Sequence, residues 1–561
     1  MSKSVRDFSR QSLKDAGNAC RDAARVLKEH GPNQIQFWFI ALAIGIAAGI
    51  AAVLFRLGIY AIQTAAYGTD DVLTLHSFAA GLAWYQILII PICGGLIVGF
   101  ILNRFTDDGR ARSVADVIES AALSEGRVEV RRGLASAVAS MITLSTGGSS
   151  GREGPVVHLA AVISTAVCRW INANGITGRD LLGCAVAAAV SASFNAPIAG
   201  ALFALEVVLR HFAVHAFAPI VIAAAVGTVI NRLVFGDVTE FALPVQNALA
   251  FYVELPAFLI LGLICGLVAV ALMKTIFWAD DFGTHVQERI GLHRMFRPAV
   301  AGAILGGLAI WWPHIIGVGY ETTSAALTGN LLLHEAIVFA ILKIIAVAVT
   351  MGGRMGGGVF SPSLMVGALT GLAFGIIATA IFPTVSGSGT LYALAGMGAV
   401  AAAVLGAPIS TTLIVFELTG DWQTGLAVMV AVSLSTALAS RLVDRSFFLT
   451  QLERRTVHLA AGPQAYLLAT FKVSSIMRVV GDNAATEEAC WELVREGTYL
   501  DGNATLEQAM PIFERGNPRF IPIVTLGGED APPELWGALF QVDALRAMNR
   551  ALSETAAEEH S

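Results

Sequence analysis

Apolar segments interrupted by glycine and proline are the feature that most constrains what this chain can fold into. They recur between residues 36 and 443, and several are shorter than the roughly 20 residues that a helix needs to cross a bilayer. Hydrophobic residues make up 55% of the 561 positions and charged residues only 14%, which excludes an ordinary soluble domain. The pattern predicts an all-α polytopic membrane protein with discontinuous helices, which are tolerated at that depth only around a buried or water-filled cavity.

Charge, cysteines and motifs narrow the class of protein further. The formal net charge of −6 lacks the basic excess that nucleic acid binding requires, and the six cysteines stand singly, without a zinc or disulfide pattern. His211 and His215 share one helix face but have no evident third ligand, so packing explains them better than a metal. Protease, hydrolase and nucleotide-loop motifs are absent, so we expect no enzyme, with lipid, ions and a second copy of the chain as partners.

Basic residues flank the apolar region at both ends. Residues 1–34 are too charged and too long for a signal peptide, and predict a cytoplasmic, partly amphipathic N-terminal helix. Four arginines follow the last apolar stretch, namely Arg441, Arg445, Arg454 and Arg455. Because basic residues stay on the cytoplasmic side, we expect both termini there, an even number of crossings and a multi-pass location in a prokaryotic plasma (inner) membrane.

An internal repeat links two distant parts of the chain. Each copy opens with a double glycine and has a glycine-rich turn that ends in proline at a helix start, GREGP at 151–155 and GVFSP at 358–362. Each copy closes with Ala-Pro-Ile and then a glutamate nine residues after the proline, Glu206 and Glu417. Paired discontinuous helices in two halves indicate a binding site near the bilayer midplane.

Helix starts of this kind attract anions, because their first N–H groups lack intrahelical partners and the macrodipole is positive there. Two such starts meeting head to head would hold a small anion without a buried lysine. Glu153 lies in the first of these turns, where its carboxylate would block the site when ionised and leave it when protonated. An acidic residue in a first turn is also a common cap, but an ionisable group inside a membrane is a functional candidate.

Three motifs resemble those of the CLC family of chloride channels and chloride/proton antiporters, in that family's order and spacing. They are GREGP at 151–155, FNAPIAG at 194–200 and GVFSP at 358–362. The resemblance implies two inverted-topology halves, a homodimer with one pore in each subunit, chloride as the first candidate anion, and Glu153 as the gating glutamate. It also implies that four residues line the anion sites through their backbone amides: Arg152, Gly154, Val359 and Phe360.

Three positions depart from that family's pattern. Arg112 falls where the family has a pore serine, whereas a neighbouring register would let Ser113 serve but breaks the match that follows. Arg112 would raise the local anion concentration if it faced the pathway, or act as ordinary positive-inside charge if it pointed to the cytoplasm. Phe448 stands where the family usually offers a tyrosine hydroxyl, so both changes would weaken chloride coordination and leave fluoride, nitrate or bicarbonate open.

The third departure concerns protons. Val207 stands where proton-exchanging members commonly have a second glutamate, which favours a passive channel gated by Glu153. An anion/proton antiporter that uses a substitute such as Glu417 is the alternative, and a transporter-like sensor that signals through the C-terminal domain is a further one. Glu206 is expected to be structural, satisfying backbone groups at a helix end.

The composition becomes that of a soluble domain after the membrane region, which we place at residues 35–456. Residues 457–551 resemble one CBS motif, a small α/β unit with an apparent insertion at 481–498. Adenine nucleotide is the candidate ligand if two copies pair across a dimer, and the alternative is a dimerising domain without any cofactor. The polar residues 552–561 are predicted to be disordered.

Overall fold

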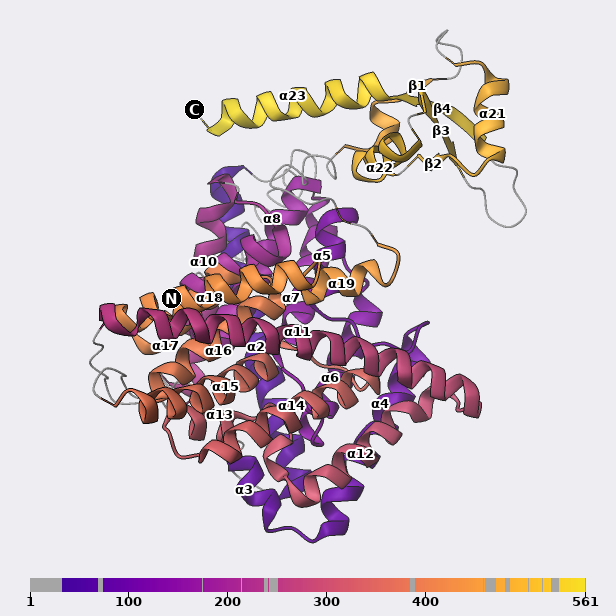
Figure 1. The fold of residues 1–561 in the computed structure, drawn as a ribbon. Helices are drawn as coiled ribbons and strands as arrows, with labels where there is room; N and C mark the ends of the chain where they lie inside the picture. The colour runs from indigo at the N-terminus through magenta and orange to yellow at the C-terminus, as the bar shows by residue number, and fades with distance from the viewer. Residues whose placement is uncertain are drawn as a thin grey trace, which may run out of the picture.

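The computed structural model contains a helical body and a small C-terminal α/β unit (Figure 1). It describes residues 33–559 with gaps at 69–73, 174, 213, 237–240, 242–250, 384–388, 458, 460–470, 480–484, 503, 517 and 526–533. The predicted N-terminal helix lies almost wholly outside the described residues. Among these, eight helices are long and apolar enough to cross a membrane by length and composition.

The helical body consists of two successive sets of helices. The first set is α2 (Gln34–Tyr67), α3 (Leu75–Ala80), α4 (Trp84–Phe105), α5 (Val114–Leu123), α6 (Val130–Ser145), α7 (Glu153–Ile171), α8 (Gly175–Phe194), α9 (Pro197–Phe203), the π-helix η2 (Ala204–Leu209) and α10 (Val214–Phe235). The second set is α11 (Phe251–Ile290), η3 (Arg294–Phe296), α12 (Arg297–Trp311), η4 (Pro313–Ile315), α13 (Tyr320–Leu327), α14 (Leu333–Gly352), α15 (Phe360–Ile381), α16 (Gly389–Leu405), α17 (Pro408–Thr419), α18 (Trp422–Leu442) and α19 (Phe447–Glu453).

The internal repeat of the sequence reappears in the packing. Helix α7 packs on α8 as α15 packs on α16, and α10 lies between α2 and α8 as α18 lies between α11 and α16. The chain leaves α8 through Asn195 and α16 through Gly406, both with left-handed backbone at φ of 57° and 69°. Glycine and asparagine adopt this conformation most readily, and a proline then begins α9 and α17.

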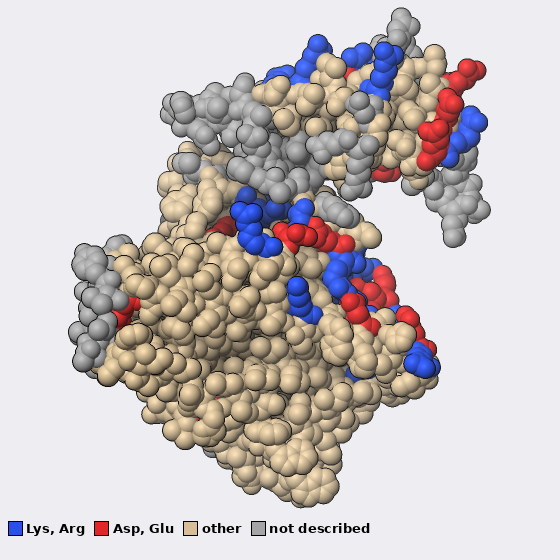
Figure 2. Space-filling model, in the orientation of Figure 1, with Lys and Arg blue, Asp and Glu red and all other residues tan. Residues whose placement is uncertain are grey.

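Helices α8 and α16 form the centre of the body. Nearly all of their residues are buried, and small alanine and glycine side chains dominate both. A helix that is apolar on every side belongs in the interior, and small residues let its neighbours approach closely. On the visible face of the molecule, charged side chains gather at the end of the body next to the C-terminal unit, while the rest of that face is almost uncharged (Figure 2).

The C-terminal unit has a four-stranded sheet in the order β1-β4-β3-β2. Its elements are η5 (Val473–Ser475), β1 (Arg478–Val479), α21 (Glu487–Arg495), β2 (Leu500–Asp501), α22 (Leu506–Gly516), β3 (Phe520–Thr525), β4 (Glu534–Phe540) and α23 (Gln541–Glu559). A separate apolar core includes Leu506, Phe513 and Ile521, so the small α/β unit that the sequence predicts is present. Its assignment as a CBS domain stays a prediction, and the predicted insertion contains α21.

Helix α23 continues to Glu559, within the residues 552–561 for which the sequence predicts disorder. The segment after Leu552 is rich in alanine and glutamate, which favour a helix once one has started. The disorder of this end stays a prediction.

Candidate functional site

The two glycine-rich turns of the repeat pair directly with each other. Gly151 N donates to Gly358 O at 2.7 Å, and Gly358 N donates to Gly151 O at 2.8 Å, in an antiparallel bridge. These two residues hold equivalent places in GREGP and GVFSP, as a two-fold relation between the halves requires. The pairing brings the start of α7 and the start of α15 together, so two positive helix ends converge on one point.

Close packing around these starts explains why glycine is used. A Cβ added at Gly154 would lie 2.9 Å from Ser113 Oγ and 3.2 Å from the Cα of Gly358. One added at Gly151 would lie 2.6 Å from Glu153 Oε2. The distances of 2.9 and 2.6 Å to the two side-chain oxygens are shorter than a carbon atom tolerates. The backbone amides therefore come closer to the site than a residue with a side chain would allow.

Glu153 is buried at the meeting point, with only 2% of its surface exposed. Its Oε1 accepts a hydrogen bond from the Ser361 hydroxyl at 2.5 Å, while Oε2 has no hydrogen-bond partner among the described residues. The carboxylate is therefore held across the two halves by one hydroxyl of the opposite repeat. Sequence reasoning did not single out Ser361, although it is the serine of GVFSP and the motif was the signal that identified the site.

A small cavity surrounds the Glu153 carboxylate, and we call it the Glu153 cavity. Its empty volume is about 260 Å³, and apart from Glu153 itself its walls are apolar or backbone. The lining includes four more residues that the sequence predicted at the site, Gly154, Val359, Phe360 and Phe448. Phe448 is 3% exposed, and the ring of Phe360 packs against Phe194 with centroids 4.6 Å apart. The structure thus brings these positions together, while their contact with an anion stays a prediction.

A second cavity, the Arg152 cavity, lies on one side of this point. Arg152 and Tyr320 line it, together with a cluster of His76, His314 and Glu321. The Arg152 guanidinium donates to the carbonyl of Ser193 at 2.9 Å and lies 5.3 Å from the centroid of the Tyr320 ring. Because Arg152 directly precedes Glu153 in the chain, the start of α7 contributes one residue to each of these two cavities.

A third cavity, the Asp280 cavity, adjoins the Glu153 cavity from another direction. Its walls include Ser113, Gly357 and Phe447, and the next residue after each of them lines the Glu153 cavity. Asp280 and several arginines line the remainder. Glu153 therefore stands between a cavity that contains Arg152 and a wide, arginine-lined cavity with an empty volume of about 660 Å³.

The sequence places Arg112 at the pore-serine position and leaves Ser113 as the neighbouring register, and which of the two contacts an anion stays a prediction. Ser113, the residue before α5, lies against Gly154 and lines the Asp280 cavity. Arg112 does not line the three cavities described above, and its guanidinium pairs with Asp108 at 3.2 Å and with Asp116 at 3.3 Å. Two adjacent residues of an extended segment point to opposite sides, so a one-residue shift exchanges the arginine for the serine.

The two repeat glutamates cap helices in the opposite repeat. Glu206 accepts from the backbone N–H of Ile409 and Ser410 at 2.9 and 2.8 Å, at the start of α17. Glu417 accepts from Ile198 and Ala199 at 3.0 and 2.7 Å, at the start of α9. The structural role expected for Glu206 is confirmed, and Glu417 has the same role.

Val207 and the two histidines complete the predicted positions. Val207 is 5% exposed within η2. His215 Nε2 lies 3.4 Å from Asp180 Oδ2. Among the described residues, no group of three or more His, Cys, Asp or Glu side chains is arranged to hold a metal ion.

Comparison with known proteins gives a consistent result. The family model described as voltage gated chloride channel matches residues 94–440. The putative chloride channel protein ClcB-like of Ralstonia nicotianae is 31% identical over 70% of this chain and 91% of its own length. The voltage-gated ClC-type chloride channel ClcB of Escherichia coli (strain SMS-3-5) is 28% identical over 73% of this chain and 97% of its own length.

A solved structure has the same fold. It is a slow cyanobacterial Cl⁻/H⁺ antiporter that superposes with a TM-score of 0.66 at 20% identity, over 76% of this chain and 98% of that one. At this identity the likeness shows the fold alone. The matched family model, the curated relatives and the paired helix starts agree, and this multi-pass membrane protein belongs to the CLC family of voltage gated chloride channels.

Proposed function

We propose that this chain conducts small anions passively across a membrane, chloride first, and that Glu153 gates the pathway. The observation that carries the proposal is the position of the Glu153 carboxylate, buried where two helix starts converge and where three cavities adjoin. A small anion and this carboxylate compete for the same backbone N–H groups, because both are negative charges that fit a helix start.

The gate follows from the surroundings of the carboxylate. When ionised, Glu153 fills the site and accepts the Ser361 hydroxyl; when protonated, it loses its attraction to the helix starts and can swing out. The apolar walls offer the two helix starts no other negative partner, so the site is more stable when it holds a negative charge. An incoming anion therefore favours the departure of the Glu153 carboxylate by taking its place. Phe448 offers no hydroxyl at the Asp280 side of the Glu153 cavity, which leaves the backbone as the main source of donors there.

Passive conduction is favoured over proton exchange by the side chains near the repeat glutamates. Val207 is apolar and cannot carry a proton. Glu417 is a poor substitute, because both of its oxygens accept backbone N–H groups of α9. A proton acceptor must be able to change partners during each cycle, whereas a capping carboxylate is fixed in place.

Anion/proton exchange is the second candidate, and one buried histidine favours it. His158 lies in α7 five residues after Glu153, is 3% exposed, and its Nδ1 has no hydrogen-bond partner among the described residues. Its ring packs directly on Gly133 of α6, where an added Cβ would be 2.8 Å from Cε1. A titratable group of this kind is the alternative to the missing glutamate as an inner proton carrier.

We also infer that two copies form a homodimer, that the membrane is the prokaryotic plasma membrane with both termini cytoplasmic, and that the C-terminal unit is CBS-like. The support is the family resemblance and the basic residues that flank the membrane region.

Chloride efflux from potassium chloride-loaded proteoliposomes that contain only the purified protein, with valinomycin carrying potassium as the counter-ion, tests the proposed function. Protein-dependent efflux, absent from empty liposomes, is the expected result. Absence of efflux at every pH from acidic to neutral would contradict anion conduction and leave the sensor interpretation standing.

A further inference from the structure

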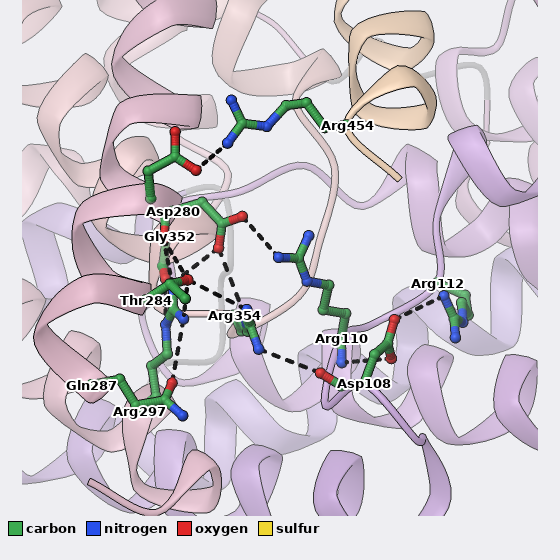
Figure 3. Close-up of polar contacts among 11 residues, drawn as sticks. Asp108, Arg110, Arg112, Asp280, Thr284, Gln287, Arg297, Gly352, Arg354 and Arg454 are labelled. Carbon is green, nitrogen blue, oxygen red and sulfur yellow. Dashed lines mark hydrogen bonds and ion pairs between the residues drawn. The ribbon is translucent and has the colours of Figure 1, made fainter. Parts of the chain in front are cut away.

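An arginine cluster surrounds the carboxylate of Asp280, a residue that lines the Asp280 cavity (Figure 3). Asp280, in α11, lies 2.9 Å from Arg297, 3.0 Å from Arg110 and 3.7 Å from Arg354. These three arginines come from distant parts of the chain and converge on Asp280 from different sides. One carboxylate carries one negative charge, so it cannot neutralise all three guanidinium groups.

Arg297 is the structural partner of Asp280. It is 4% exposed, and its guanidinium donates to the carbonyl of Gly352 at 2.8 Å as well as to Asp280. Thr284 and Gln287 accept from its Nη1 at 2.9 and 3.3 Å. A buried guanidinium with this many acceptors is satisfied without further ligands, and it offsets the charge of Asp280.

Arg110 and Arg354 therefore contribute uncompensated positive charge to the cavity wall. The hydrogen bonds of Arg354 are at the long limit, 3.4 Å to the Asp108 carbonyl and 3.5 Å to the Thr284 hydroxyl. Burial lowers the pKa of the Arg354 guanidinium, and the neighbouring Arg110 lowers it further. Repulsion between two neighbouring arginines destabilises the folded protein, and an anion that binds between them offsets this repulsion.

Two more arginines complete the wall. Arg454 and Arg455 follow α19 and also line the cavity, where they pair with Asp281 and Asp116. Each of these two arginines is paired with a carboxylate, so the excess positive charge of the lining comes from Arg110 and Arg354. The electrostatic attraction of this wall for a dianion is about twice its attraction for a halide, because the dianion carries twice the charge.

We propose that the Asp280 cavity binds a polyatomic oxyanion with at least two negative charges, of the sulfate or phosphate class, and that the bound oxyanion closes this entrance to the transported anion. The site is the pair of guanidinium groups of Arg110 and Arg354, whose planar forks match the oxygens of such an anion. Closure follows from position, since the same cavity is walled by Ser113 and Gly357, which lead to the Glu153 cavity. The closure, but not the binding, rests on the proposed function.

Binding is tested on the purified full chain in detergent by thermal melting with sulfate, at constant ionic strength, with nitrate as the monovalent reference. Sulfate is expected to raise the melting temperature and nitrate to leave it unchanged. Arg110→Gln and Arg354→Gln should each weaken the apparent sulfate affinity by at least about tenfold, the cost of one lost charged hydrogen bond. Arg297 remains beside Asp280 in both variants, so neither leaves a buried carboxylate unpaired.

Arg132→Gln is the matched control, because Arg132 is a half-exposed arginine paired with Asp107 and Glu129 outside the cavity lining. It should keep the sulfate response of the unaltered chain. Equal responses to sulfate and nitrate, or unchanged sulfate affinity in Arg354→Gln, would overturn the site. An Arg354→Lys variant keeps the charge without the fork and should give an intermediate affinity.

Closure is tested by chloride efflux with sulfate on both faces of the proteoliposomes. Sulfate should inhibit the unaltered chain and Arg132→Gln equally, and Arg354→Gln should need at least about tenfold more sulfate for the same inhibition. Uninhibited efflux despite a sulfate melting response, or protein-dependent movement of labelled sulfate, would overturn closure. If the unaltered chain shows no chloride efflux at all, the proposed function fails, while the melting result still decides the binding site.

Discussion

Glu153 and its immediate partners are the feature that matters most at the scale of single residues. The carboxylate has one hydroxyl partner, apolar walls and two helix starts around it. No other acidic side chain lines the Glu153 cavity among the described residues. Removing this one charge is therefore the most direct test of the proposed gate.

Glu153→Gln should remove the pH dependence of chloride efflux. The amide is close to the shape of the protonated acid and stays neutral at every pH, so efflux should be as high at neutral pH as at acidic pH. Efflux from proteoliposomes over a series of pH values measures this. Glu129→Gln, which alters a surface ion pair with Arg132, is the control and should retain the original profile. An unchanged profile in Glu153→Gln would remove this residue as the gate.

His76 gives a separate pH dependence, that of stability. Its ring stacks on His314 with centroids 4.3 Å apart, and its Nδ1 lies 3.0 Å from Glu321. Burial lowers the pKa of His76 to about 4, with Glu321 opposing and His314 adding to the shift. Between this value and the unfolded pKa of about 6.5, the unfolded chain binds more protons, so stability should fall as pH falls through that window.

His76→Gln should reduce this loss, because glutamine takes up no proton. The measurement is the melting temperature in detergent from about pH 7 to about pH 4. His285→Gln, at an exposed histidine of α11, is the control and should keep the original slope. A slope that His76→Gln leaves unaltered would contradict the account.

At the scale of elements, the two repeats are joined by exchanged caps. Helices α9 and α17 pack against each other, and each has its first N–H groups satisfied by the glutamate of the other repeat. Within a membrane region water does not satisfy these groups readily, so the caps hold the broken helices in place. Glu206 also accepts from the Ser410 hydroxyl at 2.8 Å.

Glu206→Ala should destabilise the protein by about 1–3 kcal/mol, the cost of leaving the first N–H groups of a helix in the membrane region without an acceptor. Glu206→Gln retains one acceptor oxygen, so its stability should lie between that of Glu206→Ala and that of the unaltered chain. Melting temperatures of the three proteins in one detergent provide the test. Equal melting temperatures of the three proteins would show that the Glu206 cap does not contribute to stability.

The start of α7 allows a steric test. Gly154→Ala places a methyl group 2.9 Å from Ser113 Oγ and 3.2 Å from the Cα of Gly358, so the serine hydroxyl must turn away and the two helix starts must separate slightly. Overpacking of this kind costs about 1–3 kcal/mol, and chloride efflux should fall sharply. Gly307→Ala is the control, since a Cβ there meets nothing within 4 Å. Normal efflux from Gly154→Ala would contradict the close approach of the two helix starts.

The sequence revealed some of these elements and concealed others for physical reasons. Ordered landmarks with equal spacing predicted the paired helix starts, because both halves use the same local turn. The sequence left Arg112 and Ser113 as alternatives because adjacent positions in an extended segment face opposite sides, and a linear pattern does not fix which one faces the site. The exchange of caps between Glu206 and Glu417 is long-range pairing, which a linear pattern cannot express.

At the scale of the whole molecule, charged side chains on the visible face gather at the end of the helical body next to the C-terminal unit (Figure 2). The Asp280 cavity is lined by arginines that the sequence separates by hundreds of residues. Only the fold brings Arg110, Asp280 and Arg354 together, so this cluster was not predictable from spacing.

The central claim is that anions pass without protons moving against a gradient. Proteoliposomes loaded with potassium chloride, treated with valinomycin so that potassium follows as the counter-ion, and diluted into low chloride should release chloride without uphill proton movement, and a proton uncoupler should leave the chloride efflux unchanged. Uphill proton movement driven by the chloride gradient, abolished by the uncoupler, would contradict passive conduction and point instead to an exchanger with His158 as its first candidate carrier.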